Sequence, residues 1–88
     1  MITKIAKIKN SVGLHARPAA LFVRTCTKYR SDIFVEKDGK KVNAKSIMGI
    51  MALGVYPNEE IKIIVDGVDE EAAIKDIMDL IENRLDQQ

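Results

Sequence analysis

The chain contains a single histidine, His15, and its neighbours suit a nitrogen nucleophile. Gly13 ends one segment, Pro18 falls within the first turn of the next, and an apolar-periodic stretch follows. This pattern predicts a helix N-terminus with the imidazole at its mouth. Helix N-termini expose unpaired backbone N–H groups and the positive end of the helix dipole, so they bind anions, phosphate above all.

Arg17 lies two residues after His15 and supplies a guanidinium suited to bidentate phosphate contact. The positive helix end and Arg17 both disfavour the imidazolium, which leaves the neutral ring that can attack phosphorus. Once the ring is phosphorylated, the same groups stabilise the added negative charge. These residues indicate reversible phosphorylation of His15, and the plainer alternative is a surface histidine in a loop before a helix.

Other kinds of chemistry find little support in the sequence. No acidic residue lies near His15, so a Ser/His/Asp arrangement cannot be completed, and paired carboxylates at catalytic spacing are not identifiable. Cys26 is the only cysteine, which excludes an intramolecular disulfide and a Cys/His zinc cluster. Because Cys26 falls inside an expected helix, we predict that it is buried as a small hydrophobic residue.

Size and composition describe a single ordinary globular domain spanning residues 1–88. The chain is 47% hydrophobic and 31% charged, with a formal net charge of +1. That charge and an aromatic content of 5% argue against a nucleic-acid-binding protein. No apolar run approaches the length of a membrane span, and no signal-peptide pattern opens the chain, so we expect a cytoplasmic protein without membrane insertion.

Hydrophobic periodicity and turn residues predict seven elements in the order β-α-β-β-α-β-α. Strands are expected over residues 3–9, 32–37, 40–44 and 60–65, and helices over 16–28, over 47–53 and after Asp69. The first strand is expected to carry Ile5 and Ile8. The first helix is expected to turn one face inward, consisting of Ala16, Ala19, Ala20, Val23 and Thr27, broadened by Phe22 and Cys26.

Local signals place the ends of the later elements. Asp38-Gly39 predicts a hairpin turn, Ser46 and Asp69 are expected N-caps, and Gly54 is expected to stop the second helix. The last helix has an apolar stripe of Ile74, Ile77, Met78, Ile81 and Leu85. Together the elements predict an α+β fold, an antiparallel sheet with helices on one face, and the strand over 60–65 inside the sheet.

Residues 47–53 are apolar nearly all round, and a single-layer cover on a small sheet can bury only one side of them. We expect Ile50 and Leu53 in the core and Ile47, Met48 or Met51 at the surface, where methionines suit several partners. Cationic residues are expected to ring this patch and to steer acidic partners; these are Arg17, Arg24, Lys28 and Lys45.

Two motifs resemble those of one known family. Residues 13–19, Gly-Leu-His-Ala-Arg-Pro-Ala, resemble the phosphorylation site of HPr, the phosphocarrier of the bacterial phosphoenolpyruvate:sugar phosphotransferase system. Residues 42–51, Val-Asn-Ala-Lys-Ser-Ile-Met-Gly-Ile-Met, resemble the family's second signature in its Firmicute-like form, at the usual spacing. The resemblance covers nearly the whole chain. It implies an open-faced β-sandwich with sheet order 1-4-2-3.

The same resemblance implies a carrier rather than an enzyme, with no cofactor or metal. His15 would accept a phosphoryl group on Nδ1 from Enzyme I and pass it to sugar-specific IIA domains, with Arg17 assisting. Ser46 would be phosphorylated by the HPr kinase/phosphorylase, which would weaken docking to Enzyme I and favour a LacI-family catabolite repressor. The implied partner surface comprises Ala16, Ala20, Arg24, Lys45, Ile47, Met48, Gly49 and Met51.

An alternative within the same family is a regulatory binding module of the Crh type, which acts mainly through Ser46. Crh has glutamine at the histidine position, whereas this chain keeps His15, which favours the carrier. Two positions depart from the common pattern. Val12 stands where many relatives have a small or hydroxyl residue, and Arg24 replaces a common glutamine. We expect both to change rates rather than the function.

Overall fold

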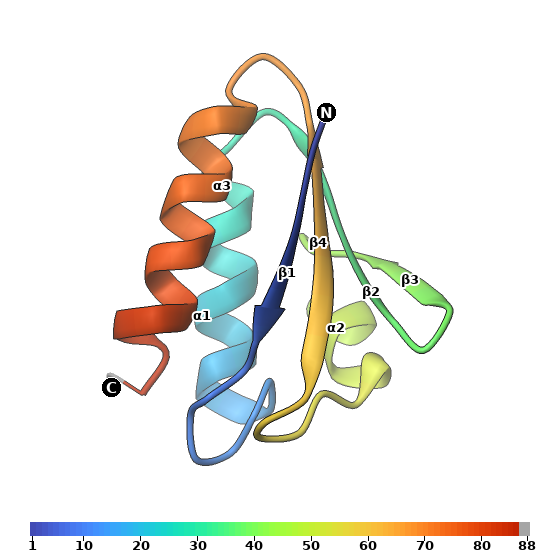
Figure 1. The fold of residues 1–88 in the computed structure, drawn as a ribbon, viewed down its shortest axis with the longest axis vertical. Coiled ribbons are helices and arrows are strands. Elements are labelled where there is room, and N and C mark those ends of the chain that lie inside the picture. Colours follow the sequence, from blue (N-terminus) through green and yellow to red (C-terminus); the bar gives the residue numbers. More distant parts are fainter. Residues whose placement is uncertain (87–88) are drawn as a thin grey trace.

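The computed structural model describes residues 1–86, which form one antiparallel sheet covered by helices on one face (Figure 1). The elements are β1 (Ile2–Lys7), α1 (Ala16–Thr27), β2 (Asp32–Lys37), β3 (Lys40–Asn43), α2 (Ile47–Leu53), β4 (Glu60–Asp66) and α3 (Glu70–Asp79), which continues into η1, a π-helical turn over Leu80–Arg84. The strand order is β1-β4-β2-β3. The predicted α+β open-faced sandwich is confirmed.

Strand β4 lies inside the sheet, as its apolar run predicts. It pairs antiparallel with β1 on one side and with β2 on the other, so that Ile63 stands opposite both Lys4 and Val35. Alternate residues of β4, namely Ile61, Ile63 and Val65, are buried under the helices. This period of two is what a half-covered antiparallel sheet requires.

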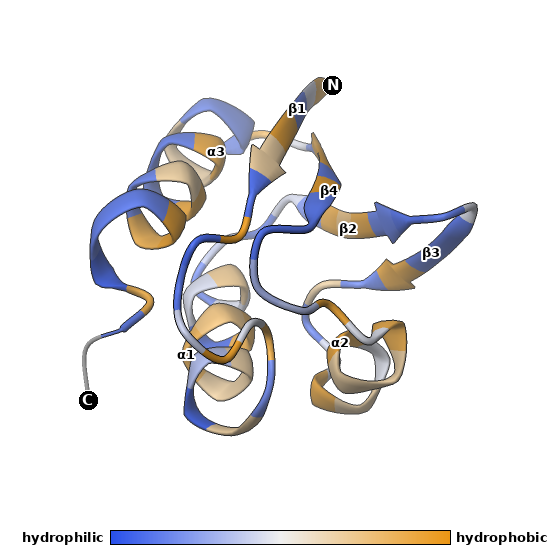
Figure 2. Cartoon of the chain, turned by 60° about the horizontal axis from the view of Figure 1, so that its bottom comes forward, coloured by the Kyte–Doolittle hydropathy of each residue, from blue (hydrophilic) through white to orange (hydrophobic). Residues whose placement is uncertain are grey.

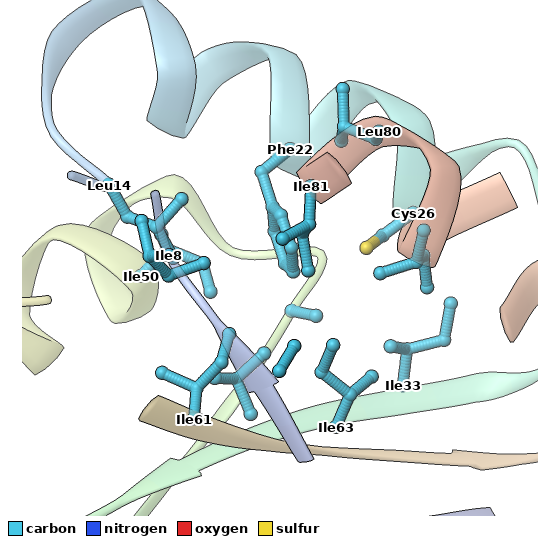
Figure 3. Packing of buried hydrophobic residues seen from close by; sticks show 14 of the residues in the cluster. Ile8, Leu14, Phe22, Cys26, Ile33, Ile50, Ile61, Ile63, Leu80 and Ile81 are labelled. Atoms are coloured by element: carbon cyan, nitrogen blue, oxygen red, sulfur yellow. The ribbon is translucent and has the colours of Figure 1, made fainter. Parts of the chain in front are cut away.

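The core fills the space between the helices and the covered face of the sheet (Figure 3). Phe22 from α1 is completely buried and lies among aliphatic side chains from both layers. Burying one large apolar side chain contributes about 1.5–3 kcal/mol, so this cluster is the main source of stability. Its largest fully buried members are Phe22, Ile8, Leu14, Ile33, Ile50, Ile61, Ile63, Ile77 and Leu80.

Helix α1 turns only part of the predicted face inward: Ala19, Phe22 and Cys26 are buried as expected. The buried residues are Pro18, Ala19, Phe22, Thr25 and Cys26, whereas Ala16, Ala20 and Thr27 are exposed and Val23 is half-buried. Large Phe22 decides the orientation of the helix because it removes more apolar surface from water than the alanines do. The prediction for Cys26 is confirmed, and burial raises the pKa of its thiol to about 12.

Strand β1 ends two residues earlier than the sequence predicts, at Lys7. Ile8 therefore lies beyond the strand, where it is fully buried, while Ile5 lies within the strand and is 57% exposed. Ala6 is the strand residue that is buried in the core. Successive side chains of a strand point to opposite faces, which places Ile5 on the open face of the sheet.

The predicted ends of α2 are confirmed, whereas the predicted cap of α3 is wrong. The Ser46 hydroxyl accepts a hydrogen bond of 3.1 Å from the backbone N–H of Gly49, and Gly54 ends the helix in the left-handed conformation with φ of 70°. Asp69 precedes α3, yet its carboxylate makes no cap bond to that helix. It bonds instead to the backbone N–H groups of Arg30 and Ser31.

Candidate functional site

His15 occupies the N-cap position of α1, as predicted. Its backbone is extended (φ −126°, ψ 155°), and its carbonyl accepts from the N–H of Ala19 at 3.5 Å. The imidazole makes no cap bond, so it does not block the N–H groups of the first turn. Nε2 is buried and finds no hydrogen-bond partner among the described residues.

The loop before His15 is held in one conformation by close backbone contacts. Gly13 has φ of +74°, and a Cβ at this position would lie only 2.3 Å from the carbonyl oxygen of Val55. The next residue, Leu14, donates its N–H to that same carbonyl at 3.0 Å. Buried Asn10 donates from Nδ2 to the carbonyl of Gly13 at 2.9 Å. Only glycine allows the two backbones to approach so closely.

The first turn of α1 combines an unusual backbone with the predicted cation. Ala16 has φ of 52°, a left-handed conformation that costs a non-glycine residue roughly 1–2 kcal/mol. Such outliers cluster at functional sites, and this one directly follows His15. Exposed Arg17 and buried Pro18 come next. Pro18 lacks an N–H, but no helical carbonyl would be available to it at this position.

A tyrosine that the sequence analysis did not single out lies against the histidine. The ring centroids of His15 and Tyr56 are 5.0 Å apart, and the ring planes are tilted by 50°. Tyr56 is 58% exposed and belongs to the segment between α2 and β4. Figure 1 shows this segment beside the loop that connects β1 to α1. No local sequence motif could predict this contact, because the two residues are far apart in the chain.

A half-buried ion pair between Lys37 and Glu59 lies close to Tyr56. The Lys37 ammonium is 2.9 Å from Oε1 of Glu59 and donates to the carbonyl of Gly54 at 2.7 Å. The same Glu59 oxygen accepts the backbone N–H of Tyr56 at 2.8 Å. These two donors, first the Tyr56 N–H and then Lys37, hold the pKa of Glu59 below its usual range. The segment carrying Tyr56 is thereby fixed to β2.

An apolar surface lies on α2, the helix that contacts α1. Met48 is 80% exposed, Met51 46% and Ile47 40%, whereas Ile50 and Leu53 are buried, so the predicted division of α2 is confirmed. Figure 2 shows the orange, hydrophobic colour along α2 next to α1. The other residues of the predicted surface lie on α1, or at or just before the start of α2. Ala16, Ala20 and Arg24 on α1 are exposed, and Lys45 and Gly49 are half-buried.

Two of the four expected cations are engaged elsewhere. The Lys45 ammonium donates to the carbonyl of Tyr29 at 2.7 Å, and the Lys28 ammonium lies 3.0 Å from Oδ2 of Asp76 on α3. Fewer cations than predicted are therefore available around the apolar patch. The side chains of Arg17 and Arg24 on α1 are exposed to solvent.

Comparisons with known proteins agree with this arrangement. Residues 2–83 match the family model PTS-HPr, described as the PTS HPr component phosphorylation site. The chain is 49% identical over 82 residues to the HPr-like protein Crh of Halalkalibacterium halodurans, covering 93% of this chain and 98% of that one. It is 40% identical to the phosphocarrier protein HPr of Treponema pallidum over the full length of both chains.

A solved structure is similar as well. The crystal structure of HPr-C-His from Thermoanaerobacter tengcongensis superposes with a TM-score of 0.96 at 57% identity, covering 100% of this chain and 99% of that one. The chain belongs to the HPr family of the phosphotransferase system. HPr is a phosphocarrier rather than a catalytic enzyme. Within residues 1–86, no helix has the length and apolar character needed to cross a membrane.

Proposed function

We propose that this protein is the phosphoryl carrier of a phosphoenolpyruvate-dependent sugar phosphotransferase system and acts in the cytoplasm. His15 takes a phosphoryl group from Enzyme I and gives it to sugar-specific IIA domains. The observation that carries the proposal is the state of the one histidine. Its ring stands at the N-terminus of α1 without capping it, and Nε2 is buried, which leaves Nδ1 for the reaction.

The transfer needs only the nucleophile and groups that stabilise negative charge. The Nδ1 lone pair forms the N–P bond while the bond between phosphorus and the donor breaks, and the electron pair of that bond leaves with the donor. The reverse exchange passes the group to the acceptor. Because the N–P bond formed in the first exchange is broken in the second, the protein returns to its starting state after each cycle.

Two features of the first turn support the charge of the phosphoryl group. The early N–H groups of α1 have no helical acceptor, and the positive end of the helix dipole faces the site. Arg17, two residues from His15, adds a fixed cation that can contact phosphate through two nitrogens. These groups favour the phosphorylated form without a cofactor.

Ser46 is proposed as a second, regulatory phosphorylation site for the HPr kinase/phosphorylase. Its hydroxyl already caps α2, so a phosphate there would sit at a helix N-terminus and add roughly −1.5 to −2 charge at neutral pH. That charge adjoins Ile47 and Met48, the exposed start of α2. The modification would weaken docking to Enzyme I and favour a LacI-family catabolite repressor.

The partner surface is proposed to be the apolar patch of α2 with the neighbouring face of α1. Exposed methionines adapt to differently shaped partners, and small alanines permit close approach. Enzyme I and the IIA domains would use the same surface in turn, since both must reach His15. The residues are Ala16, Ala20, Arg24, Lys45, Ile47, Met48, Gly49 and Met51.

The carrier role is tested by reconstituting sugar phosphorylation from phosphoenolpyruvate, Enzyme I and membranes that hold sugar-specific components. The protein should support transfer, and His15→Ala should abolish it. Lys40→Ala, which changes an exposed residue beside the hairpin turn, is the control and should transfer normally. Transfer that persists without His15 would refute the proposal.

A regulatory module is the second candidate, and the similarity to the HPr-like protein Crh is the observation that favours it. In that case Ser46 and the α2 surface would carry the function and His15 would turn over little. Sugar phosphorylation separates the two candidates, because a carrier supports it through His15 and a regulatory module supports little of it. Binding to a LacI-family repressor after treatment with HPr kinase/phosphorylase and ATP should depend on Ser46 and survive His15→Ala under both candidates.

A further inference from the structure

Tyr56 contacts the imidazole of His15 from a segment outside α1. The centroid distance of 5.0 Å and the tilt of 50° fall within the range in which aromatic rings attract each other. Nε2 of His15 has no hydrogen-bond partner among residues 1–86, so no bond through that nitrogen orients the ring. The contact with Tyr56 therefore contributes directly to the orientation of the imidazole.

The segment that carries Tyr56 is rigidly joined to the loop before His15. Val55, the preceding residue, accepts the N–H of Leu14 at 3.0 Å. Two residues after Tyr56, Asn58 donates its N–H to the carbonyl of Ile8 at 2.6 Å. The two segments are thus bonded on both sides of the tyrosine, which fixes the distance between the backbones that carry the two rings.

Lys37 lies near the Tyr56 ring and binds the segment that carries it. Its side chain is only 14% exposed, and its ammonium lies 6.0 Å from the centroid of the Tyr56 ring. That distance is at the limit of a cation–π attraction. Its partner Glu59 binds the Tyr56 N–H. The tyrosine is therefore placed before any reactant arrives.

We infer that Tyr56 is a positioning residue for phosphoryl transfer at His15. Its ring holds the plane of the imidazole so that Nδ1, rather than the buried Nε2, faces the incoming phosphorus. A fixed nucleophile avoids an orientational cost in the transition state, which affects the rate at saturation more than the affinity for the donor. The inference rests on the proposed function of His15.

The test compares Tyr56→Phe, which keeps the ring, with Tyr56→Ala, which removes it. The reaction is phosphorylation of the intact protein by purified Enzyme I and phosphoenolpyruvate, with the concentration of the carrier varied. Tyr56→Ala should lower kcat about three- to tenfold, the factor that a lost aromatic pair is worth, with KM little changed. Tyr56→Phe should stay within about twofold of the native protein.

A spectroscopic reading separates positioning from general damage. Because the chain has one histidine, its ring protons give the only imidazole signals in the NMR spectrum. Tyr56→Ala should shift these signals as the ring current disappears, and Tyr56→Phe should largely preserve them. Val68→Ala removes an 84%-exposed apolar side chain from the connection between β4 and α3 and should change neither the signals nor the rate. Figure 1 shows this connection at the end of the sheet opposite the segment between α2 and β4.

The possible failures point to different conclusions. If the native protein accepts no phosphate, the proposed function falls and this inference falls with it. If the native protein is phosphorylated and Tyr56→Ala reacts at the same rate, only the inference about Tyr56 is overturned. A rise in KM with unchanged kcat and unchanged imidazole signals would also overturn it, because Tyr56 would then contact the donor rather than position His15.

Discussion

The Asp69 carboxylate binds Ser31 twice: Oδ1 accepts the backbone N–H at 2.9 Å and the hydroxyl at 2.5 Å. The other oxygen accepts the N–H of Arg30 at 2.8 Å. These bonds connect the turn before α3 to the start of β2. First the Ser31 hydroxyl and then the Arg30 N–H lower the pKa of Asp69 to about 2.

Replacing Asp69 should therefore alter how stability depends on acid. Since the folded-state pKa lies below the ordinary value of 3.8, the carboxylate stabilises the fold above that value and loses its effect as pH falls toward about 2. Asp69→Asn should be less stable at neutral pH and lose less stability between those limits. Urea unfolding at a series of pH values measures this.

Asp32→Asn is the matched control, because it removes an exposed carboxylate next to Ser31. The acid sensitivity of this variant should stay close to that of the native protein. Equal acid sensitivity of the native protein and Asp69→Asn would show that the bonds to Ser31 and Arg30 do not stabilise the fold.

The close approach at Gly13 makes a second prediction. Gly13 and Gly39 both have positive φ, but a Cβ on Gly13 meets Val55, whereas a Cβ on Gly39 meets nothing within 4 Å. Gly39→Ala should cost about 1–2 kcal/mol through its backbone conformation alone. Gly13→Ala should cost more and slow phosphorylation of His15 as well. Chemical unfolding and phosphoryl transfer are the two measurements, and equal costs would contradict the close contact.

Ser46 allows its structural and regulatory roles to be measured apart. Ser46→Ala removes the hydroxyl that binds the Gly49 N–H and should cost about 1 kcal/mol of unfolding free energy. Ser46→Asp keeps a capping oxygen and should recover most of that stability. Thermal or urea unfolding tests both variants. If Ser46→Ala is as stable as the native protein, the cap contributes nothing to α2.

Removing a side chain from the buried side of α2 should lower stability, whereas removing one from the exposed side should leave it nearly unchanged. Ile50→Ala empties a fully buried position and should cost about 2–5 kcal/mol. Met48→Ala removes an 80%-exposed side chain and should change stability by less than about 0.5 kcal/mol. Met48→Ala should nevertheless weaken binding to Enzyme I, measured by titration calorimetry. Unchanged binding would remove Met48 from the proposed partner surface.

Much of the fold could be predicted because its signals are local. Helix α2 begins after Ser46 and ends at Gly54, because their residue types favour the conformations found at helix ends. Asp38-Gly39 forms the expected turn between β2 and β3. The strong apolar run over residues 60–65 predicted that β4 lies inside the sheet. In each case residues close in the sequence are sufficient to specify the structure.

The predictions were wrong where contacts between residues far apart in the sequence determine the structure. The position of Asp69 before α3 predicted a helix cap, but its carboxylate instead accepts a hydrogen bond from the N–H of Ser31, which directly precedes β2. The face that α1 buries depends on how Phe22 fits the core. The Tyr56 ring contacts the His15 ring only because the segment before β4 packs against the loop before α1. Sequence periodicity contains no information about such long-range neighbours.

The central claim is that His15 carries the phosphoryl group, and intact-mass measurement tests it most directly. The native protein, incubated with phosphoenolpyruvate and purified Enzyme I, should gain the mass of one phosphoryl group and lose it on brief acid treatment. His15→Ala should gain none. An acid-stable phosphate, or a phosphate on His15→Ala, would contradict the account.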